Sequence, residues 1–214
     1  MYNDTPETIV WAIRHGQTEW NAQGRLQGQL PVTLDEQGRD QARALRPALE
    51  ALDWDLAISS DLVRVVETAQ LALGDRAEGL LLDERLRERH LGVLQGHLYT
   101  EARQTMPEVI KIFSGGPPQA PIPEGESLVE FHERCVGALE ALRQTHKGRK
   151  VLVFTHGGVL REWFKHIVGA PIDAPRRFST ANTSINELHV RKWGWFIQSW
   201  GDTAHMAKTG FLPH

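Results

Sequence analysis

The sequence predicts an α/β protein with a mostly parallel β-sheet and helices packed on its faces. Short apolar runs, such as residues 8–13 and 150–155, alternate with longer amphipathic segments, such as residues 62–73. This alternation is typical of strand–helix–strand units, which build parallel sheets. The chain has 214 residues, of which 41% are hydrophobic and 24% charged, so it is long enough for a sizeable core. The composition excludes disordered, collagen-like and disulfide-stabilised proteins.

The first part of the chain is expected to form three strands and two helices. The predicted strands are residues 8–13, 55–59 and 80–82, and the predicted helices are residues 33–52 and 62–73. Thr33 and Glu36 have the spacing of a capping box, which predicts the start of the first helix. Apolar side chains recur at helical spacing through the second helix, which indicates one buried face.

The rest of the chain is expected to form three helices and three strands around an irregular stretch. The predicted helices are residues 100–113, 128–142 and 157–167, and the predicted strands are residues 150–155, 184–190 and 193–200. Glycine and proline are concentrated between residues 115 and 123, which predicts irregular structure there. The last two strands read as a hairpin around Gly194. We expect one domain over residues 1–214, in which residues 86–126 are an insertion.

Charge and cysteine content limit the partners and the compartment. Lys and Arg number 24 and Asp and Glu 27, which leaves a net charge of -3. A chain this balanced does not hold nucleic acid or an anionic membrane through its overall field. Cys135 is the one cysteine and cannot form an internal disulfide; no apolar run approaches the ~18 residues of a membrane span. We expect a cytoplasmic protein with no nucleic-acid or membrane partner, and the oligomeric state stays open.

Polar residues follow four predicted strands at the point where each strand ends. They are Arg14 and His15 after the first strand, Ser60 to Arg64 after the second, Glu88 after the third, and His156 and Gly157 after residues 150–155. Ligands of open α/β sheets bind beyond the carboxyl ends of the strands. We therefore expect these side chains to converge on one site.

The chemistry of this set matches a phosphate dianion. The guanidinium groups of Arg14 and Arg64 offset its charge, and the free backbone amides at Gly157 extend the cradle. Of the two imidazoles, on His15 and His156, one is then free to attack phosphorus. The chain has no Gly-x4-Gly-Lys-Ser/Thr segment, which leaves nucleotide-driven phosphoryl transfer without support.

Glu88 is the candidate acid for the leaving group. A carboxyl group beside a bound anion keeps its proton more readily, and it can then donate that proton to the departing alkoxide. The surrounding arginines favour the charged carboxylate instead. The residues alone leave this balance open.

Three motifs together are similar to those of the histidine phosphatase superfamily, which includes phosphoglycerate mutases and many phosphomonoesterases. Residues 14–21 read Arg-His-Gly-Gln-Thr-Glu-Trp-Asn, close to the family's Arg-His-Gly-x-Thr-x-x-Asn. Residues 60–69 resemble the pattern Ser-x-Leu-x-Arg-Ala-x-x-Thr-Ala, with Val65 in place of the usual Ala. His156, Gly157 and Gly158 complete the set in the family's order.

The resemblance implies roles for the residues that match. It makes His15 the nucleophile that forms a phosphohistidine and Glu88 the proton donor, and Asn21 helps to line the pocket. The phosphoryl group is then bound by Arg14, Arg64 and His156. The resemblance also implies a three-layer α/β/α sandwich whose mostly parallel sheet has an antiparallel edge strand from the tail. It implies neither a metal nor an organic cofactor for hydrolysis.

One further segment bears on the subtype within the family. Residues 86–96 are similar to the mutase segment Glu-Arg-His-Tyr-Gly-x-Leu-Gln-Gly, but Leu91 replaces its Tyr, the insertion is shorter, and residues 111–123 contain no arginine. We predict a phosphomonoester hydrolase for a small phosphorylated metabolite. The alternatives are a phosphoglycerate mutase, which needs 2,3-bisphosphoglycerate priming, and a non-catalytic phosphate sensor. Lys111 and the proline-rich stretch are expected to overhang the pocket and set its specificity.

A zinc site is the alternative suggested by the ten histidines. Its ligands would be His15, His90, His97 and His156. The chain contains neither a His-x3-His pair nor a cysteine pair with ligand spacing. We therefore expect no metal.

Overall fold

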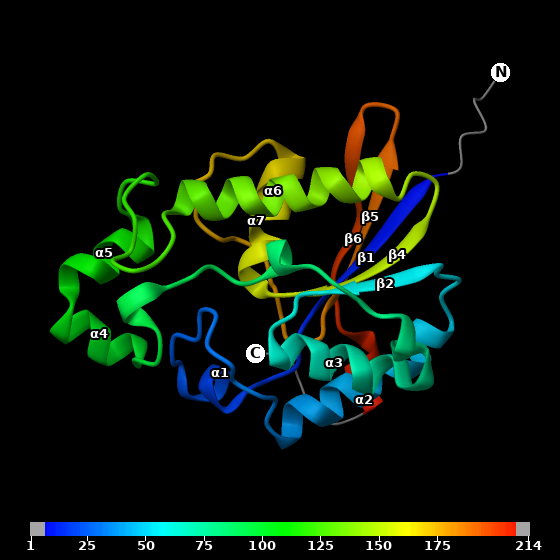
Figure 1. Ribbon diagram of the computed structural model, residues 1–214, viewed down its shortest axis with the longest axis horizontal. Helices are drawn as coiled ribbons and strands as arrows, with labels where there is room; N and C mark the ends of the chain where they lie inside the picture. Colours follow the sequence, from blue (N-terminus) through cyan, green and yellow to red (C-terminus); the bar gives the residue numbers. More distant parts are fainter. Residues whose placement is uncertain (1–6, 209–214) are drawn as a thin grey trace.

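A six-stranded sheet runs through the centre of the computed structural model, which describes residues 7–208 (Figure 1). The strands lie in the order β3-β2-β4-β1-β5-β6. β1 pairs in parallel with β4, β4 with β2, and β2 with β3, whereas β5 is antiparallel to both of its neighbours, β1 and β6. The bounds are β1 (Thr8–Arg14), β2 (Leu56–Ser59), β3 (Leu81–Leu82), β4 (Lys150–Thr155), β5 (Ile185–Arg191) and β6 (Gly194–Asp202). The predicted mostly parallel sheet with an antiparallel strand from the tail is confirmed. The antiparallel strand is β5, and β6, which lies outside it at the edge, runs in the same direction as β1.

Helices cover both faces of the sheet, as the three-layer prediction requires. In Figure 1, α6 (Leu128–Thr145) and α7 (Gly157–Val168) lie on one face, and α2 (Glu36–Glu50) and α3 (Val63–Leu73) lie on the other. Successive side chains of a strand point to opposite faces, and both faces of β1 and β4 are buried. This explains why the central strands read as continuous apolar runs.

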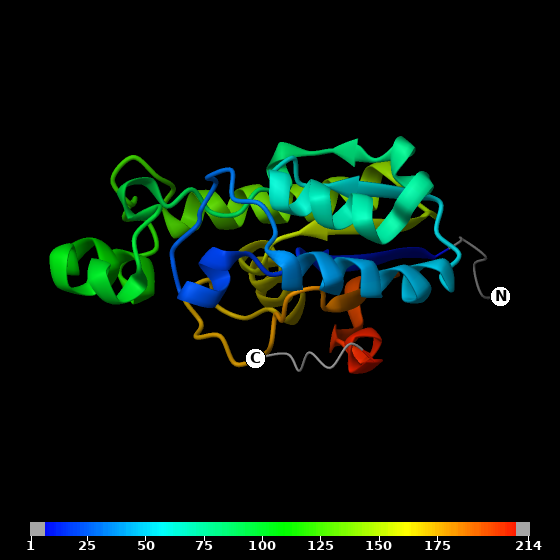
Figure 2. The same ribbon diagram turned by 90° about the horizontal axis from the view of Figure 1, so that it is seen from below.

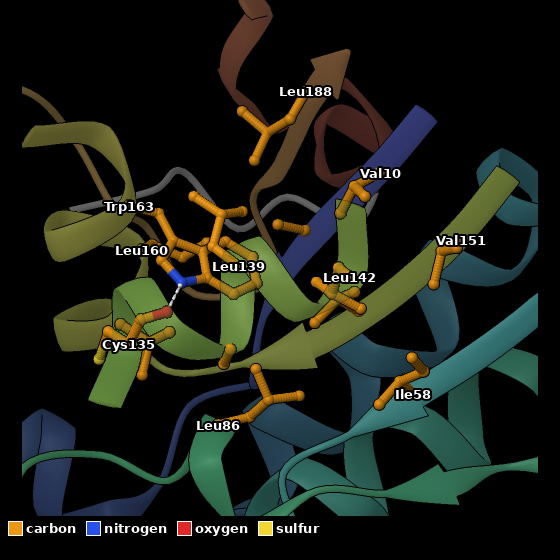
Figure 3. Close-up of a cluster of buried hydrophobic side chains, with 14 of the residues drawn as sticks. Val10, Ile58, Leu86, Cys135, Leu139, Leu142, Val151, Leu160, Trp163 and Leu188 are labelled. Carbon is orange, nitrogen blue, oxygen red and sulfur yellow. Dashed lines mark hydrogen bonds between the residues drawn. The ribbon is translucent and has the colours of Figure 1, made fainter. Parts of the chain in front are cut away.

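The core on the α6 and α7 face packs around Trp163. This side chain is fully buried, and its indole Nε1 donates a hydrogen bond of 2.7 Å to the carbonyl of Cys135 (Figure 3). The bond joins α7 to α6 and satisfies the one polar atom of the indole. Val10 of β1 and Val151 of β4 belong to the same cluster. The packing of α7 against α6 also holds the start of α7 beside the end of β4.

Two predicted helices differ from the structure. Asp35, not Thr33, caps α2, and its carboxylate accepts a 2.7 Å hydrogen bond from the amide of Gly38. The predicted Thr33–Glu36 capping box is therefore wrong; a carboxylate nearer the helix start fits its positive dipole better. The single helix predicted over residues 100–113 is two helices, because Pro107 begins a new one and cannot continue the previous turn.

The insertion has its own small apolar cluster. Its helices are α4 (Tyr99–Thr105) and α5 (Pro107–Gly115), and Figure 2 shows both beyond the end of the sheet. The cluster consists of Leu91, Leu94, Ala102, Ile110 and Ile122. The assignment of residues 1–214 to a single domain remains a prediction.

The remaining elements are short. They are α1 (Glu19–Gln23) and four 3-10 helices over Gly74–Gly79, Glu84–Leu86, Gly92–Leu94 and Ala204–Lys208. β5 and β6 form the predicted hairpin, in which Arg191 pairs with Gly194. Within residues 7–208, no helix combines the length and the apolar character that crossing a bilayer requires.

Candidate active site

The carboxyl ends of β1, β2 and β4 meet at one edge of the sheet, and the two motif histidines lie there. Arg14 at the end of β1 is in register with Thr155 at the end of β4. The next residue of each strand is therefore His15 or His156, and their ring centroids are 5.2 Å apart. Parallel pairing thus places side by side two residues that are far apart in the sequence.

His15 has one ring nitrogen committed and one free. Its Nδ1 lies 2.7 Å from the carbonyl oxygen of Gly16, and because a carbonyl only accepts, Nδ1 carries the proton. The lone pair is then on Nε2, the nitrogen required for attack. The side chain is only 3% exposed. Burial, followed by the charges of Arg64 and Arg14, holds the pKa of His15 well below 6.5, so the ring stays neutral and nucleophilic.

His156 is held between two protein groups. Nη2 of Arg64 donates to Nδ1 of His156 at 3.1 Å, and Nε2 of His156 lies 2.9 Å from Oγ of Ser60. Because a guanidinium only donates, the proton of the imidazole is on Nε2 and points to Ser60. Burial, then Arg64 and His15, lower the pKa of this ring well below 6.5. A contact between His156 and phosphate therefore requires one of these bonds to open.

The two motif arginines each present an unpaired buried donor. Nη2 of Arg64 also donates to the Gly28 carbonyl at 2.8 Å, and Nη1 of Arg14 donates to the Thr180 carbonyl at 2.6 Å. The Nε atoms of both arginines are buried, with no hydrogen-bond partner among the described residues. Burial lowers the pKa of each guanidinium to about 10, so both remain charged at neutral pH. Buried donors without partners are costly, and an anionic acceptor would satisfy them.

Glu88 lies against the start of α7. Its Oε2 accepts from the amide of Gly158 and its Oε1 from the amide of Arg89, each at 2.9 Å. A side chain at residue 158 would collide with Glu88, since a Cβ there would lie 1.9 Å from Oε1. Of the backbone amides of Gly157 and Gly158, Glu88 therefore occupies that of Gly158. Gly157 lines the cavity beside Arg14 and is the one left for a ligand.

Asn21 is also at the cavity, with half of its amide already used. Its Oδ1 accepts from the backbone amide of Thr18 at 3.2 Å and from the Thr18 hydroxyl at 3.1 Å. These bonds form the capping box of α1. The Asn21 amide nitrogen is the part that remains available to a ligand.

These side chains surround a cavity of about 240 Å³, which also contains residues that sequence analysis missed. The predicted residues at the cavity are Arg14, His15, Asn21, Arg64, Glu88 and Gly157. The additional charged residues are Arg25, Arg89, Arg161 and Arg176. The wall therefore carries six arginines against one glutamate, although the whole chain has a net charge of -3. Any anionic ligand is thus attracted locally and not by the overall charge.

Some of these residues carried a signal in the sequence. Arg161 is one helical turn beyond Gly157, so it shares a face of α7 with the predicted phosphate site. Arg176 lies in an irregular segment between α7 and β5, where no periodicity points to a site.

From the insertion, Leu91 and Phe113 line the cavity. Lys111 is exposed and is not among the lining residues, so the expectation that it overhangs the pocket is wrong. Among residues 7–208, no group of three or more His, Cys, Asp or Glu side chains is arranged to hold a metal ion.

Comparisons with known proteins agree with this geometry. The chain matches the histidine phosphatase superfamily (branch 1) over residues 10–203. It is 40% identical to phosphoglycerate mutase-like protein 4 of Arabidopsis thaliana over 98% of this chain and 90% of that protein. It is 38% identical to the metal-independent phosphoserine phosphatase of the same plant, over 96% of this chain and 86% of that protein. The structure of YhfR from Bacillus stearothermophilus superimposes with a TM-score of 0.86 at 31% identity, covering 93% of this chain and 99% of that one.

Proposed function

Because this chain belongs to the histidine phosphatase superfamily, we propose that it hydrolyses a small phosphomonoester through a phosphohistidine on His15. One observation carries the proposal: Arg14 and Arg64, whose buried Nε donors have no partner among the described residues, line the same cavity as the neutral ring of His15. Two guanidinium donors offset the charge of a phosphate dianion and of the loose transition state in which its phosphoryl group is transferred. The relative that is named a metal-independent phosphatase supports a reaction without a metal.

In the first step, Nε2 of His15 attacks phosphorus, the N–P bond forms, and the bond from phosphorus to the ester oxygen breaks. The departing oxygen takes a proton from the protonated carboxyl group of Glu88 and leaves as an alcohol. Glu88 can reach the cavity in a fixed orientation because two backbone amides hold its carboxylate. Protonation of the leaving group contributes roughly 10²–10⁴-fold to such reactions.

In the second step, water attacks the phosphohistidine and gives a proton to the Glu88 carboxylate. The N–P bond breaks, inorganic phosphate leaves, and His15 regains its free Nε2. The hydrogen bond from Nδ1 to the Gly16 carbonyl keeps the ring oriented through both steps. Arg14 and Arg64 hold the non-bridging oxygens throughout.

The alternative is a phosphoglycerate mutase, as the name of one relative suggests. The extra arginines at the cavity supply cationic contacts that the arginine-free stretch 111–123 does not. Phosphate release from nitrophenyl phosphate, measured with and without 2,3-bisphosphoglycerate, separates the two. A phosphatase turns over without the bisphosphate. A requirement for it, together with transfer between positions of phosphoglycerate, would establish the mutase, and phosphate binding without turnover would establish a sensor.

The extra arginines also bear on the substrate. Arg89 donates from Nε and Nη2 to one backbone carbonyl, and Arg25 donates from Nη1 to another. Nε of Arg161 lies 3.3 Å from the buried carboxylate of Glu162. Arg176 has no ion pair with any described residue. The pKa of Arg14 is lowered first by burial and further by the positive charge of Arg176. The two cations are therefore close enough to repel each other.

We therefore propose that the substrate carries a carboxylate beside its phosphate and that Arg176 binds that carboxylate. The phosphoserine phosphatase among the relatives acts on such a compound by name. Phosphoserine and phosphoethanolamine form a matched pair, since they differ only in the carboxylate.

The ratio of kcat/KM for phosphoserine to that for phosphoethanolamine tests this substrate class. A charged hydrogen bond contributes about 1.5–3 kcal/mol, so Arg176→Ala should lower the ratio roughly tenfold or more. Arg177→Ala is the control, because this neighbouring arginine is exposed and does not line the cavity. An unchanged ratio in Arg176→Ala would contradict the carboxylate contact.

A further inference from the structure

The peptide unit between His15 and Gly16 is held at both of its polar ends by side chains. Its carbonyl, on His15, accepts a 2.9 Å hydrogen bond from Nδ2 of Asn182. Its amide, on Gly16, donates a 3.0 Å hydrogen bond to Oγ1 of Thr68. The two side chains come from α3 and from the segment before β5, and neither lines the cavity.

Each of these side chains is itself fixed. The Thr68 hydroxyl is fully buried and donates to the Arg64 carbonyl at 2.6 Å. Next to Asn182, Thr183 has φ 55, in the left-handed region that a β-branched residue rarely adopts. Its amide donates to the Arg14 carbonyl at 3.1 Å and, over the longer distance of 3.4 Å, to the His15 carbonyl, and its hydroxyl donates to the Asn182 carbonyl at 2.8 Å. A strained conformation of this kind persists only where its surroundings over-determine it, so Asn182 has a fixed place behind the nucleophile.

The orientation of this peptide controls the orientation of the His15 ring. The His15 carbonyl and the Gly16 amide belong to one planar peptide unit. Hydrogen bonds at these two groups therefore fix the orientation of that plane, and with it ψ of His15. The next carbonyl along the chain, on Gly16, is the acceptor for Nδ1 of the ring. The position of that acceptor depends on the plane before it. A rotated plane would withdraw the acceptor, and the proton would no longer be confined to Nδ1.

We infer that Asn182 and Thr68 are positioning residues that clamp the His15–Gly16 peptide and thereby keep the lone pair of His15 on Nε2, aimed at the substrate. The consequence for the rate of phosphohistidine formation rests on the proposed function; the effect on the ring tautomer does not. A displacement of a reacting group by about 1 Å can cost on the order of 10²-fold in rate.

The chain offers a matched control for Asn182. Nδ2 of Asn186 donates to the Ala12 carbonyl at 2.9 Å, so it makes the same kind of bond from the same side of β1, three residues before His15. Asn186 is fully buried, and its loss should destabilise the fold at least as much as the loss of Asn182. It does not contact the clamped peptide.

The test is the nitrogen-15 NMR spectrum of the His15 ring, combined with the single-turnover rate of phosphohistidine formation from nitrophenyl phosphate. The parent and Asn186→Ala should show one tautomer, with the proton on Nδ1. Asn182→Ala and Thr68→Val should show a mixture and form phosphohistidine at least about tenfold more slowly, and Thr68→Ser should restore both signals. The affinity of Asn182→Ala for inorganic phosphate should stay within about twofold of the parent, because this substitution removes no hydrogen bond to Arg14 or Arg64.

Two results would overturn the clamp. One is a parent-like tautomer in both Asn182→Ala and Thr68→Val. The other is a loss of rate in Asn182→Ala that Asn186→Ala shares in proportion to its loss of melting temperature. A parent protein that never becomes phosphorylated would contradict the proposed function instead, and the ring nitrogen signals would still decide whether the clamp exists.

Discussion

The two sides of the cavity are built in different ways. The catalytic wall consists of Arg14, His15 and Arg64, which stand at the end of β1 or in the first turn of α3, with the fully buried His156 behind them. The insertion wall consists of Leu91 and Phe113, which belong to a segment with its own small cluster beyond the end of the sheet (Figure 2). The catalytic wall follows the end of a central strand and the start of α3, whereas the insertion wall is held by its own apolar cluster and by loop backbone hydrogen bonds such as that from Val93 to Pro123. We propose that the first wall carries out phosphoryl transfer and that the second wall, together with Arg176, influences substrate choice.

The largest expected effect is on the catalytic wall. His15→Ala removes the attacking nitrogen and should lower turnover of nitrophenyl phosphate by at least about 10³-fold. Arg14 and Arg64 remain, so the variant should still bind phosphate weakly, as calorimetry can show. Parent-like hydrolysis by this variant would end the assignment of the nucleophile.

Glu88 lines the same cavity and should show a selective effect. Glu88→Gln cannot protonate a leaving group, so it should slow alkyl phosphates by roughly 10²-fold or more. Nitrophenyl phosphate, whose leaving group needs little protonation, should slow far less. Glu84→Gln is the control, since that carboxylate is 76% exposed on its side chain. Equal slowing of both substrates by Glu88→Gln would remove its acid role.

The insertion wall should change substrate preference without abolishing chemistry. Phe113→Ala removes an apolar surface and should lower the preference for aryl over small polar phosphates by about tenfold, in line with the loss of a few apolar contacts. Lys111→Ala, on the same helix but exposed, should leave the preference unchanged. A panel of kcat/KM values measures both, and the assignment of specificity fails if the two variants behave alike.

The smallest expected effect is on stability. The pKa values of His15 and His156 are held well below 6.5, first by burial and then by nearby positive charge. In the unfolded chain both rings take up protons near pH 6.5, so below that pH the unfolded state binds more protons than the folded one. The free energy of unfolding should fall as pH drops below 6.5, by up to about 1.4 kcal/mol per histidine per pH unit.

Urea denaturation at pH 7.5 and pH 5.5 measures this change. The decrease in the free energy of unfolding should be smaller in His15→Asn, which has lost one of the two buried rings, than in the control His97→Asn, because His97 is exposed. An equal drop in both variants would show that the acid sensitivity comes from elsewhere in the chain.

Sequence analysis predicted that the histidines after β1 and β4 would meet, because the pairing of neighbouring parallel strands brings their carboxyl ends together. A parallel strand fixes where its last residue points, so the motif residues after β1 and β4 could be expected to meet. The histidine phosphatase family is confirmed by the match over residues 10–203. The cap of α2 was misplaced because both Thr33 and Asp35 are good N-cap residues, and the choice between them depends on how the preceding loop reaches the helix.

The other features depend on tertiary contacts that no spacing encodes. Arg176 reaches the cavity from an irregular segment, and Asn182 reaches the His15 carbonyl across the end of the sheet. Thr68 stood in a recognised motif, but its hydrogen bond to the Gly16 amide appears only once α3 is packed on the sheet. The split of the insertion helix at Pro107 was the exception, because the proline was visible in the sequence.

The most direct test is to quench the parent protein during turnover of nitrophenyl phosphate and locate the phosphoryl group by mass spectrometry. The phosphoryl group should be found on Nε2 of His15, with none on His156 and none in His15→Ala. Rapid hydrolysis with no phosphorylated His15, or with the phosphoryl group on another residue, would contradict the account.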